Sequence, residues 1–192
     1  MLEIKPTALI VSLLVALSSL PCRAADGSWI EQAGGGWSLP ANWSGGAVAS
    51  GAGAVATLNA NWTNVLYVNL DADATVGKLY YRDSGQVNKD MFLQSTSGRG
   101  LTLAGGGIQN PPEIEANTRS LSIEVPLAGT EGALFRCGQA NMQLSLSASN
   151  SYTGNTLIAP AVGKVTVKAS GSLGTGVVTV QDDGDSADTD LQ

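Results

Sequence analysis

Short tripeptides with the pattern apolar, any residue, apolar recur along the chain at nearly even intervals. Their first residues are separated by 22, 20, 23 and 21 positions. The tripeptides are Leu79-Tyr80-Tyr81, Leu101-Thr102-Leu103, Leu121-Ser122-Ile123, Leu144-Ser145-Leu146 and Val165-Thr166-Val167. Such alternation predicts half-buried strands, and steps of this size are typical of solenoid repeats. The pattern therefore predicts an all-β solenoid with coils of about 20–23 residues.

A second apolar series lies 13 residues after each of these anchors. Its members are Phe92, Ile114, Leu134, Leu157 and Val178. One corner of each coil would then have a constant length, and the other a variable one. Stacked coils would pair through parallel hydrogen bonds, with the outer residues of each tripeptide pointing inward. No stretch after residue 25 shows a helical period.

One corner carries a recognisable motif, Asn150, Tyr152, Gly154 and Thr156. With the flanking strands, it resembles the autotransporter-associated β-strand repeat of bacterial surface proteins over residues 121–180. The other matching positions are Leu144-Ser145-Leu146, Gly163, Val165, Val167 and Ser172-Leu173-Gly174-Thr175-Gly176. The resemblance implies a right-handed parallel β-helix that is exported and acts as a surface or passenger structure.

Each motif residue has an expected task at this corner. Gly154 and Asn155 are expected to take left-handed turn angles. Asn150 is expected to bond its own backbone or a neighbouring coil. Tyr152 is expected to lie over the corner as a lid on the core.

The N-terminal part is rich in tryptophan, and residues 25–62 are expected to form a cap. Trp29, Trp37, Trp43 and Trp62 lie in this segment. A solenoid has an open end with unpaired edges, which such a segment could cover. In an alternative interpretation, Trp29, Trp37 and Trp43 form a platform that contacts carbohydrate. The solenoid itself is predicted over residues 63–181.

The first residues indicate an export signal. Lys5 precedes an apolar run over residues 8–17, and the segment that follows has small residues at Cys22 and Ala24. This arrangement predicts a signal peptide over residues 1–24, cleaved after Ala24. A membrane anchor is the alternative, although the run is short for a bilayer, and lipidation of Cys22 is another. The expected location is extracellular, or at the outer-membrane surface of a bacterium.

Charge is sparse and acidic. The mature chain would carry 8 basic and 15 acidic residues, five of the latter in the predicted acidic tail at residues 182–192. This balance argues against nucleic acid as a partner. The tail lacks the residue spacing of a calcium loop, and no cofactor or metal is predicted. After cleavage Cys137 is the one remaining cysteine, so no internal disulfide is expected.

Catalytic candidates are few. The chain contains no histidine, which removes the commonest general base. Cys137 is interpreted as a buried small hydrophobe. Glu113 and Glu115 would flank an inward Ile114 and face solvent about 7 Å apart, a spacing that could suit glycoside chemistry. A solvated face is the competing interpretation, and it applies also to Asp71 with Asp73 and to Arg82 with Asp83.

The sequence therefore predicts a non-catalytic, adhesin-like passenger module for cell-surface display or extracellular matrix attachment. The alternative is a carbohydrate-binding or polysaccharide-cleaving β-helix protein. Expected partners are extracellular polysaccharide, or a host or neighbouring surface. Membrane attachment is expected only through a C-terminal translocator or anchor, and nothing in this sequence resembles either. An uncapped last coil near Val180 suggests a chain that continues beyond Gln192.

Overall fold

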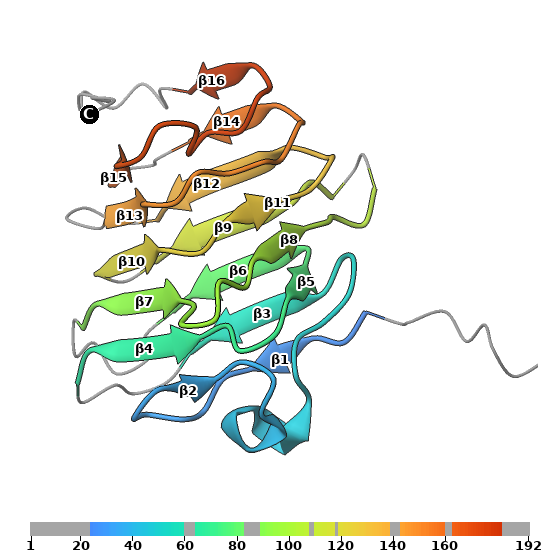
Figure 1. Ribbon diagram of the computed structural model, residues 1–192, viewed down its shortest axis with the longest axis vertical. Helices are drawn as coiled ribbons and strands as arrows, with labels where there is room; N and C mark the ends of the chain where they lie inside the picture. The colour runs from blue at the N-terminus through green and yellow to red at the C-terminus, as the bar shows by residue number, and fades with distance from the viewer. Residues whose placement is uncertain are drawn as a thin grey trace, which may run out of the picture.

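A computed structural model of the chain describes residues 24–59, 64–82, 89–107, 110–117, 119–138, 143–159 and 163–181. They form a β-solenoid of about five turns with parallel strands and almost no helix, which confirms the predicted fold class. The coils stack from the N-terminal end, at the bottom of Figure 1, to the C-terminal end at the top. The predicted signal peptide before Ala24 and the acidic tail lie outside the described residues.

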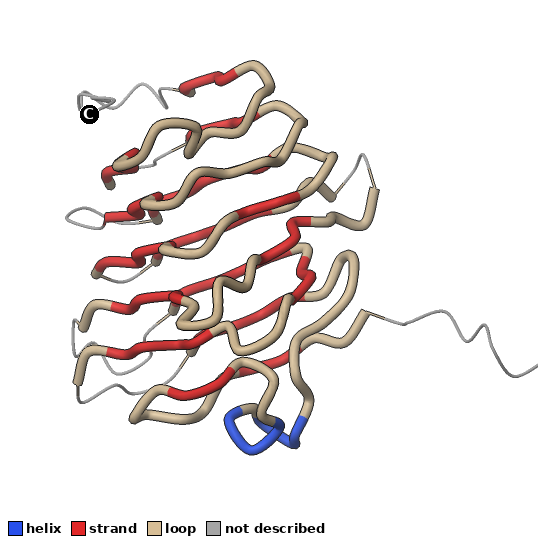
Figure 2. Tube along the Cα trace, viewed as in Figure 1, coloured by secondary structure: helices blue, strands red, loops and turns tan. Residues whose placement is uncertain are grey.

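Three parallel sheets form the faces of the solenoid (Figure 1, Figure 2). Sheet I contains β1 (Gly27–Ser28), β3 (Val55–Leu58), β6 (Lys78–Tyr81), β9 (Glu113–Ala116), β12 (Ala133–Cys137), β14 (Thr156–Ile158) and β16 (Val178–Val180). Sheet II contains β2 (Gly35–Gly36), β4 (Leu66–Asn69), β7 (Met91–Gln94), β10 (Ser120–Ile123), β13 (Gln143–Leu146) and β15 (Lys164–Val167). Sheet III contains β5 (Ala74–Val76), β8 (Leu101–Leu103) and β11 (Leu127–Ala128).

The core consists of columns of apolar residues that pair in register between coils. One column of sheet I runs through Ala56, Leu79, Ile114, Phe135, Ile158 and Val180. Its steps are 23, 35, 21, 23 and 22 residues. The long step contains β7, β8 and the connections at residues 82–90 and 104–112. The other steps agree with the coil length predicted from the tripeptides.

The tripeptide anchors do not all stack, which corrects the expected series. Leu121, Leu144 and Val165 do form one column of sheet II. Leu79, however, lies in sheet I, and Leu101 lies in sheet III. The pattern apolar, any residue, apolar describes a strand on any face, so an even spacing does not identify which face each strand occupies.

The second apolar series is also only partly inward. Ile114 is fully buried, as expected. Leu134 and Leu157 are half-buried on the outer side of sheet I, because their neighbours Phe135 and Ile158 fill the core. Phe92 belongs to sheet II and alternates with the buried residues on either side of it.

The Trp-rich segment is both the first turn of the solenoid and its cap. β1 and β3 pair in sheet I, and β2 pairs with β4 in sheet II. Two short 3-10 helices, η1 (Pro40–Asn42) and η2 (Ser44–Gly46), cross the N-terminal end (Figure 1). At the other end β15 and β16 are edge strands, and the apolar side chains of Val177 and Val178 are exposed. None of the helices in the described part of the chain has the length and apolar character needed to cross a membrane.

Candidate functional site

Asn150 connects three consecutive coils. Its Oδ1 accepts a hydrogen bond from the Leu127 N–H at 2.8 Å, and its Nδ2 donates to the Ser172 carbonyl at 2.5 Å. These partners lie in the preceding and the following coil, and the side chain is only 7% exposed. The prediction that Asn150 bonds a neighbouring coil is confirmed. The residue satisfies backbone groups that would otherwise be buried without partners.

Tyr152 lies inside the core, so the expected position as a lid over the corner is wrong. Its side chain is fully buried, and its ring centroid is 6.4 Å from that of Phe135. The Thr156 hydroxyl donates to the Leu173 carbonyl at 2.9 Å, which leaves Tyr152 as the donor in their 2.8 Å bond. Burial raises the pKa of Tyr152, and the bond to Thr156 partly offsets that rise. The tyrosine is therefore a satisfied core residue.

Gly154 is required for close packing and does not adopt the left-handed angle expected from the sequence. It is absent from the glycines with positive φ among the described residues. A Cβ at this position would collide with the backbone of Gly132 in the preceding coil, and one at Gly176 would collide with the backbone of Gly154. We call Gly132, Gly154 and Gly176 the glycine column. Its members recur every 22 residues, a signal that was present in the sequence.

Three tryptophans form a closed cluster at the N-terminal end. Trp43 makes edge-to-face contacts with Trp29 and Trp37, with centroids 5.2 Å and 4.8 Å apart. Each indole N–H donates to a backbone carbonyl, and none of the three side chains is more than 2% exposed. The rings therefore leave no face on which a sugar could stack. The structure supports the capping interpretation over carbohydrate contact for these three; Trp62 lies outside the described residues.

A group of charged and aromatic side chains lies on the outer side of sheet I. We call it the charged strip; it comprises Lys78, Tyr80, Arg82, Glu113, Glu115 and Arg136 from β6, β9, β12 and the residue after β6. Glu113 accepts a hydrogen bond from the Tyr80 hydroxyl at 3.2 Å and lies 3.4 Å from Lys78 Nζ. On its other side Arg136 Nε is 3.5 Å away. Glu115 pairs with Arg82 at 3.3 Å.

The expectation that both glutamates face solvent freely is wrong. The side chains of Glu113 and Glu115 are 11% and 16% exposed, because cations and an aromatic ring from adjacent coils cover them. Arg82 also lies 4.5 Å from the centroid of the Tyr80 ring, a cation–π distance. Burial raises the pKa of Tyr80, and the nearby Glu113 raises it further. The strip therefore bridges coils and leaves no free pair of carboxylates.

The carboxylates of Asp71 and Asp73 accept hydrogen bonds from neighbouring turns. Asp71 accepts hydrogen bonds from the Ser38 N–H at 2.9 Å and the Ser38 hydroxyl at 2.7 Å. Burial acts to raise the pKa of Asp71, but these and other backbone bonds outweigh it, so the pKa is lowered. Asp73 accepts from the Gly100 N–H at 3.1 Å and pairs with Arg99 at 3.4 Å. The two carboxylates thus hold different segments; Asp83 lies outside the described residues.

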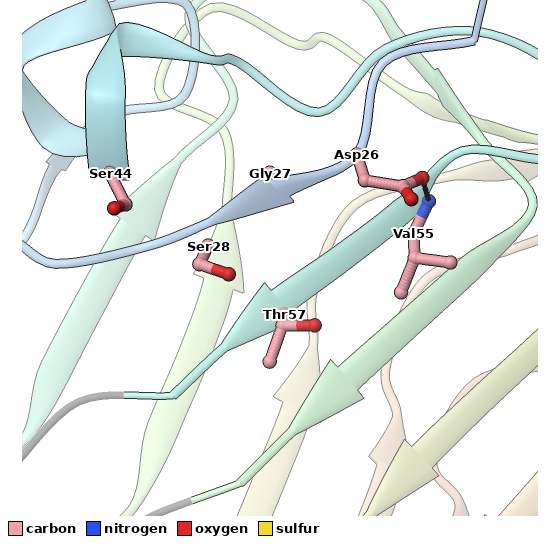
Figure 3. A pocket seen from close by; sticks show the side chains of 6 residues that line it. All are labelled: Asp26, Gly27, Ser28, Ser44, Val55 and Thr57. Atoms are coloured by element: carbon pink, nitrogen blue, oxygen red, sulfur yellow. Dashed lines mark hydrogen bonds between the residues drawn. The ribbon is translucent and has the colours of Figure 1, made fainter.

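A polar pocket opens beside the first strands of sheet I (Figure 3). It has a volume of about 360 Å³ and is lined by Asp26, Gly27, Ser28, Ser44, Val55 and Thr57. Asp26 already accepts a hydrogen bond from the Val55 N–H at 2.8 Å. One engaged carboxylate and three hydroxyl groups can receive a neutral polar group, but this lining provides no acid–base pair.

Cys137 has the inert character predicted for it. The side chain is fully buried, and its thiol donates to the Lys164 carbonyl at 3.3 Å. Burial raises the pKa of the thiol from 9.0 to about 11, the opposite of what a nucleophile needs. Among the described residues, no three side chains of the metal-ligating acidic, Cys or His types gather into a group that could hold a metal.

Sequence reasoning missed one surface feature, an outward-facing aromatic pair on sheet II in which Tyr67 is exposed and Phe92 is half-buried. Tyr67 and Phe92 are register partners on β4 and β7, and their rings stack with centroids 5.2 Å apart. Strict alternation was the available signal, since Tyr67 lies between inward Leu66 and Val68. The 13-residue spacing alone instead places Phe92 in an apolar series.

Comparison with known proteins adds no relative: no protein-family model, no curated protein and no solved structure matches this chain. The resemblance to the autotransporter-associated repeat therefore rests on its motif residues.

Proposed function

We propose that this chain is a non-catalytic, exported structural module of the adhesin-like passenger type, acting in surface display or matrix attachment. The observation that carries the proposal is the use made of Glu113. This carboxylate, the most enclosed on the outer surface of sheet I, receives Lys78, Tyr80 and Arg136 from the coils on both sides. The carboxylate oxygens of Glu113 therefore interact with side chains that join adjacent coils.

Other polar groups support the same proposal. A glycosidase requires one carboxyl group that can donate a proton and another that can attack or activate water. Glu115, the nearest acidic neighbour along β9, is itself paired with Arg82. Both the oxygen and the nitrogen of the Asn150 side-chain amide likewise form hydrogen bonds with backbone groups of adjacent coils. Hydrogen bonds and ion pairs of this kind between coils would stabilise an exported rod that has no disulfide.

Export provides the first test of this proposal. Residues 1–192 with a C-terminal epitope tag would be expressed in a Gram-negative bacterium beside a control that lacks residues 2–24. We expect the full chain outside the cytoplasm with Ala25 as its N-terminus, and the control inside. Full-length protein retained in the cytoplasm with its leader intact would contradict export.

Attachment provides the second test. Beads coated with residues 25–192 are expected to adhere to extracellular polysaccharide or to a cell surface more than beads coated with the unfolded chain. Equal adhesion of the two preparations would contradict an attachment role. One observation favours the alternative of carbohydrate binding within this role, namely the half-exposed Tyr67 ring beside Phe92.

A further inference from the structure

The outer side of sheet II presents a flat aromatic platform. The rings of Tyr67 and Phe92 are inclined by only 18° to one another. Tyr67 is 48% exposed, while Leu66 and Val68 on either side are fully buried, so its ring points to solvent. An exposed flat ring gains most from a partner that has a flat apolar face of its own.

The platform continues into a line of small hydroxyl side chains. We call the line the central column; it runs through the register partners Tyr67, Phe92, Ser122, Ser145 and Thr166. These residues lie on successive coils, so their spacing is that of paired strands, about 4.8 Å. The column thus places two rings and three hydroxyls in one row across five coils.

The short hydroxyl side chains of the column are largely covered by longer side chains around them. Ser122 and Ser145 are 6% and 4% exposed although they point away from the core. Gln143 Nε2 donates to the Thr166 hydroxyl at 2.8 Å and so passes beside Ser145. Within the described part of the chain, the Ser145 hydroxyl has no hydrogen-bond partner, and its outward position leaves it to be satisfied by a ligand or by water.

The charges on this face do not favour a strongly charged ligand. The central column is neutral, and the residues flanking it are mixed in sign on both sides. One flank carries Asp90, which pairs with Arg119 at 3.4 Å, and Lys164. The other flank carries Glu124 and Lys168. An anionic polymer or a nucleic acid would need a stripe of one positive sign. A neutral ligand that carries many hydroxyl groups meets no such requirement.

We propose that the central column of sheet II binds a neutral polysaccharide. A sugar ring would lie on the Tyr67–Phe92 platform through its C–H face, and sugar hydroxyls would exchange hydrogen bonds with Ser145 and its neighbours. This inference rests on the proposed attachment function and names the ligand class and the face for it. The proposed carbohydrate-contacting residues are thus those of the central column and not the buried tryptophans.

Native affinity electrophoresis of residues 25–192 through gels containing soluble polysaccharides tests the inference. Neutral probes would be barley β-glucan, xylan, mannan and hydroxyethyl cellulose; anionic probes would be alginate and polygalacturonate. We expect retardation by at least one neutral probe and none by the anionic ones. Tyr67→Ala should weaken the binding about tenfold, whereas Tyr67→Phe should bind like the wild type because the ring remains.

Leu39→Ala is the matched control, because Leu39 has a similar exposure of 52% but lies at the N-terminal cap. It should leave the retardation unchanged. No retardation by any neutral probe, retardation by anionic probes alone, or equal binding by Tyr67→Ala would each overturn the inference. If Tyr67→Ala fails to fold, NMR shift changes on adding an oligosaccharide to wild-type protein decide the question. They should concentrate at Tyr67, Phe92, Ser122 and Ser145, and changes elsewhere would overturn the proposal.

The result is separable from that of the proposed function. If coated beads adhere equally with Tyr67→Ala and wild type, attachment stands and the central column is wrong as its site. If the full chain is not exported, the proposed function fails whatever the electrophoresis shows.

Discussion

At the scale of single residues, polar side chains in this chain mainly join one coil to the next. The buried Ser172 hydroxyl donates to the Ala148 carbonyl at 2.7 Å, and Asn150 bonds to coils on both sides. The Thr156 hydroxyl accepts a hydrogen bond from Tyr152 and donates one to the Leu173 carbonyl of the following coil. The corner motif is therefore explained by hydrogen bonds within and between coils.

Replacing Asn150 by alanine tests this explanation. The change removes one acceptor and one donor from a buried site and leaves the Leu127 N–H and the Ser172 carbonyl without partners. We expect the free energy of unfolding in urea to fall by about 2–4 kcal/mol. Asn155→Ala, which loses a 3.2 Å bond at an exposed site, should cost less than about 1 kcal/mol. Equal losses in the two variants would contradict the bridging role.

Cys137 gives a prediction about pH and reactivity. Since burial raises the pKa of the thiol from 9.0 to about 11 in the folded chain, the thiolate is favoured by unfolding. Stability should be unaffected by this group below about pH 8 and should decline as the pH rises towards 11. In residues 25–192, a thiol reagent at about pH 8 should label the protein only after unfolding. Rapid labelling of the native protein would contradict the burial.

Sequence reasoning succeeded at this scale where a residue's role depends on its own chemistry. The inert Cys137 and the bridging Asn150 are of this kind. It failed for Glu113 and Glu115, because their exposure depends on Lys78, Arg82 and Arg136, which other coils supply. Those neighbours are known only when the register of β6, β9 and β12 is known.

At the scale of elements, the fold depends on close stacking of strands and corners in register. Residues of the glycine column touch backbone to backbone where the chain turns into sheet I. The sequence predicted strands and coil length well, because alternation and spacing report them directly. It could not tell which of three faces each strand occupies, so Leu79 and Leu101 were placed in one column although they belong to different sheets.

Gly154→Ala is the sharpest test of the glycine column. The added methyl group would meet backbone atoms of Gly132 that cannot move without separating two coils. We expect a loss of about 3 kcal/mol in the free energy of unfolding. Gly98→Ala is the control, because Gly98 has φ of +70° but no atom within 4 Å of an added Cβ. It should cost about 1–2 kcal/mol from backbone strain alone, and a similar cost for both variants would argue against close stacking.

At the scale of the whole molecule, the two ends of the solenoid differ. Trp29, Trp37 and Trp43 close the N-terminal end with a dry cluster. The C-terminal end presents the edges of β15 and β16, with Val177 67% exposed. Stacked repeats gain stability from each interface with a neighbour. The cap should therefore stabilise the first coils, and these coils should in turn stabilise the rest.

Trp43→Ala tests the cap. Trp43 contacts both other indoles and is 1% exposed, so truncation leaves a large cavity. We expect a loss of about 3–5 kcal/mol, measured by urea unfolding. The exposed Leu39→Ala should change stability by less than about 0.5 kcal/mol. A loss below about 1 kcal/mol for Trp43→Ala would show that the solenoid does not depend on its cap.

We propose that this rod attaches to its surroundings without altering them. In the most direct measurement, residues 25–192 are incubated with insoluble polysaccharides. The amount of protein retained and the number of sugar ends released are then measured in the same sample. A commercial glycosidase verifies that release is detectable. We predict retention without released products, and the same retention for Glu113→Gln. Products that appear with the wild type and vanish with Glu113→Gln would contradict the claim, as would a complete lack of retention.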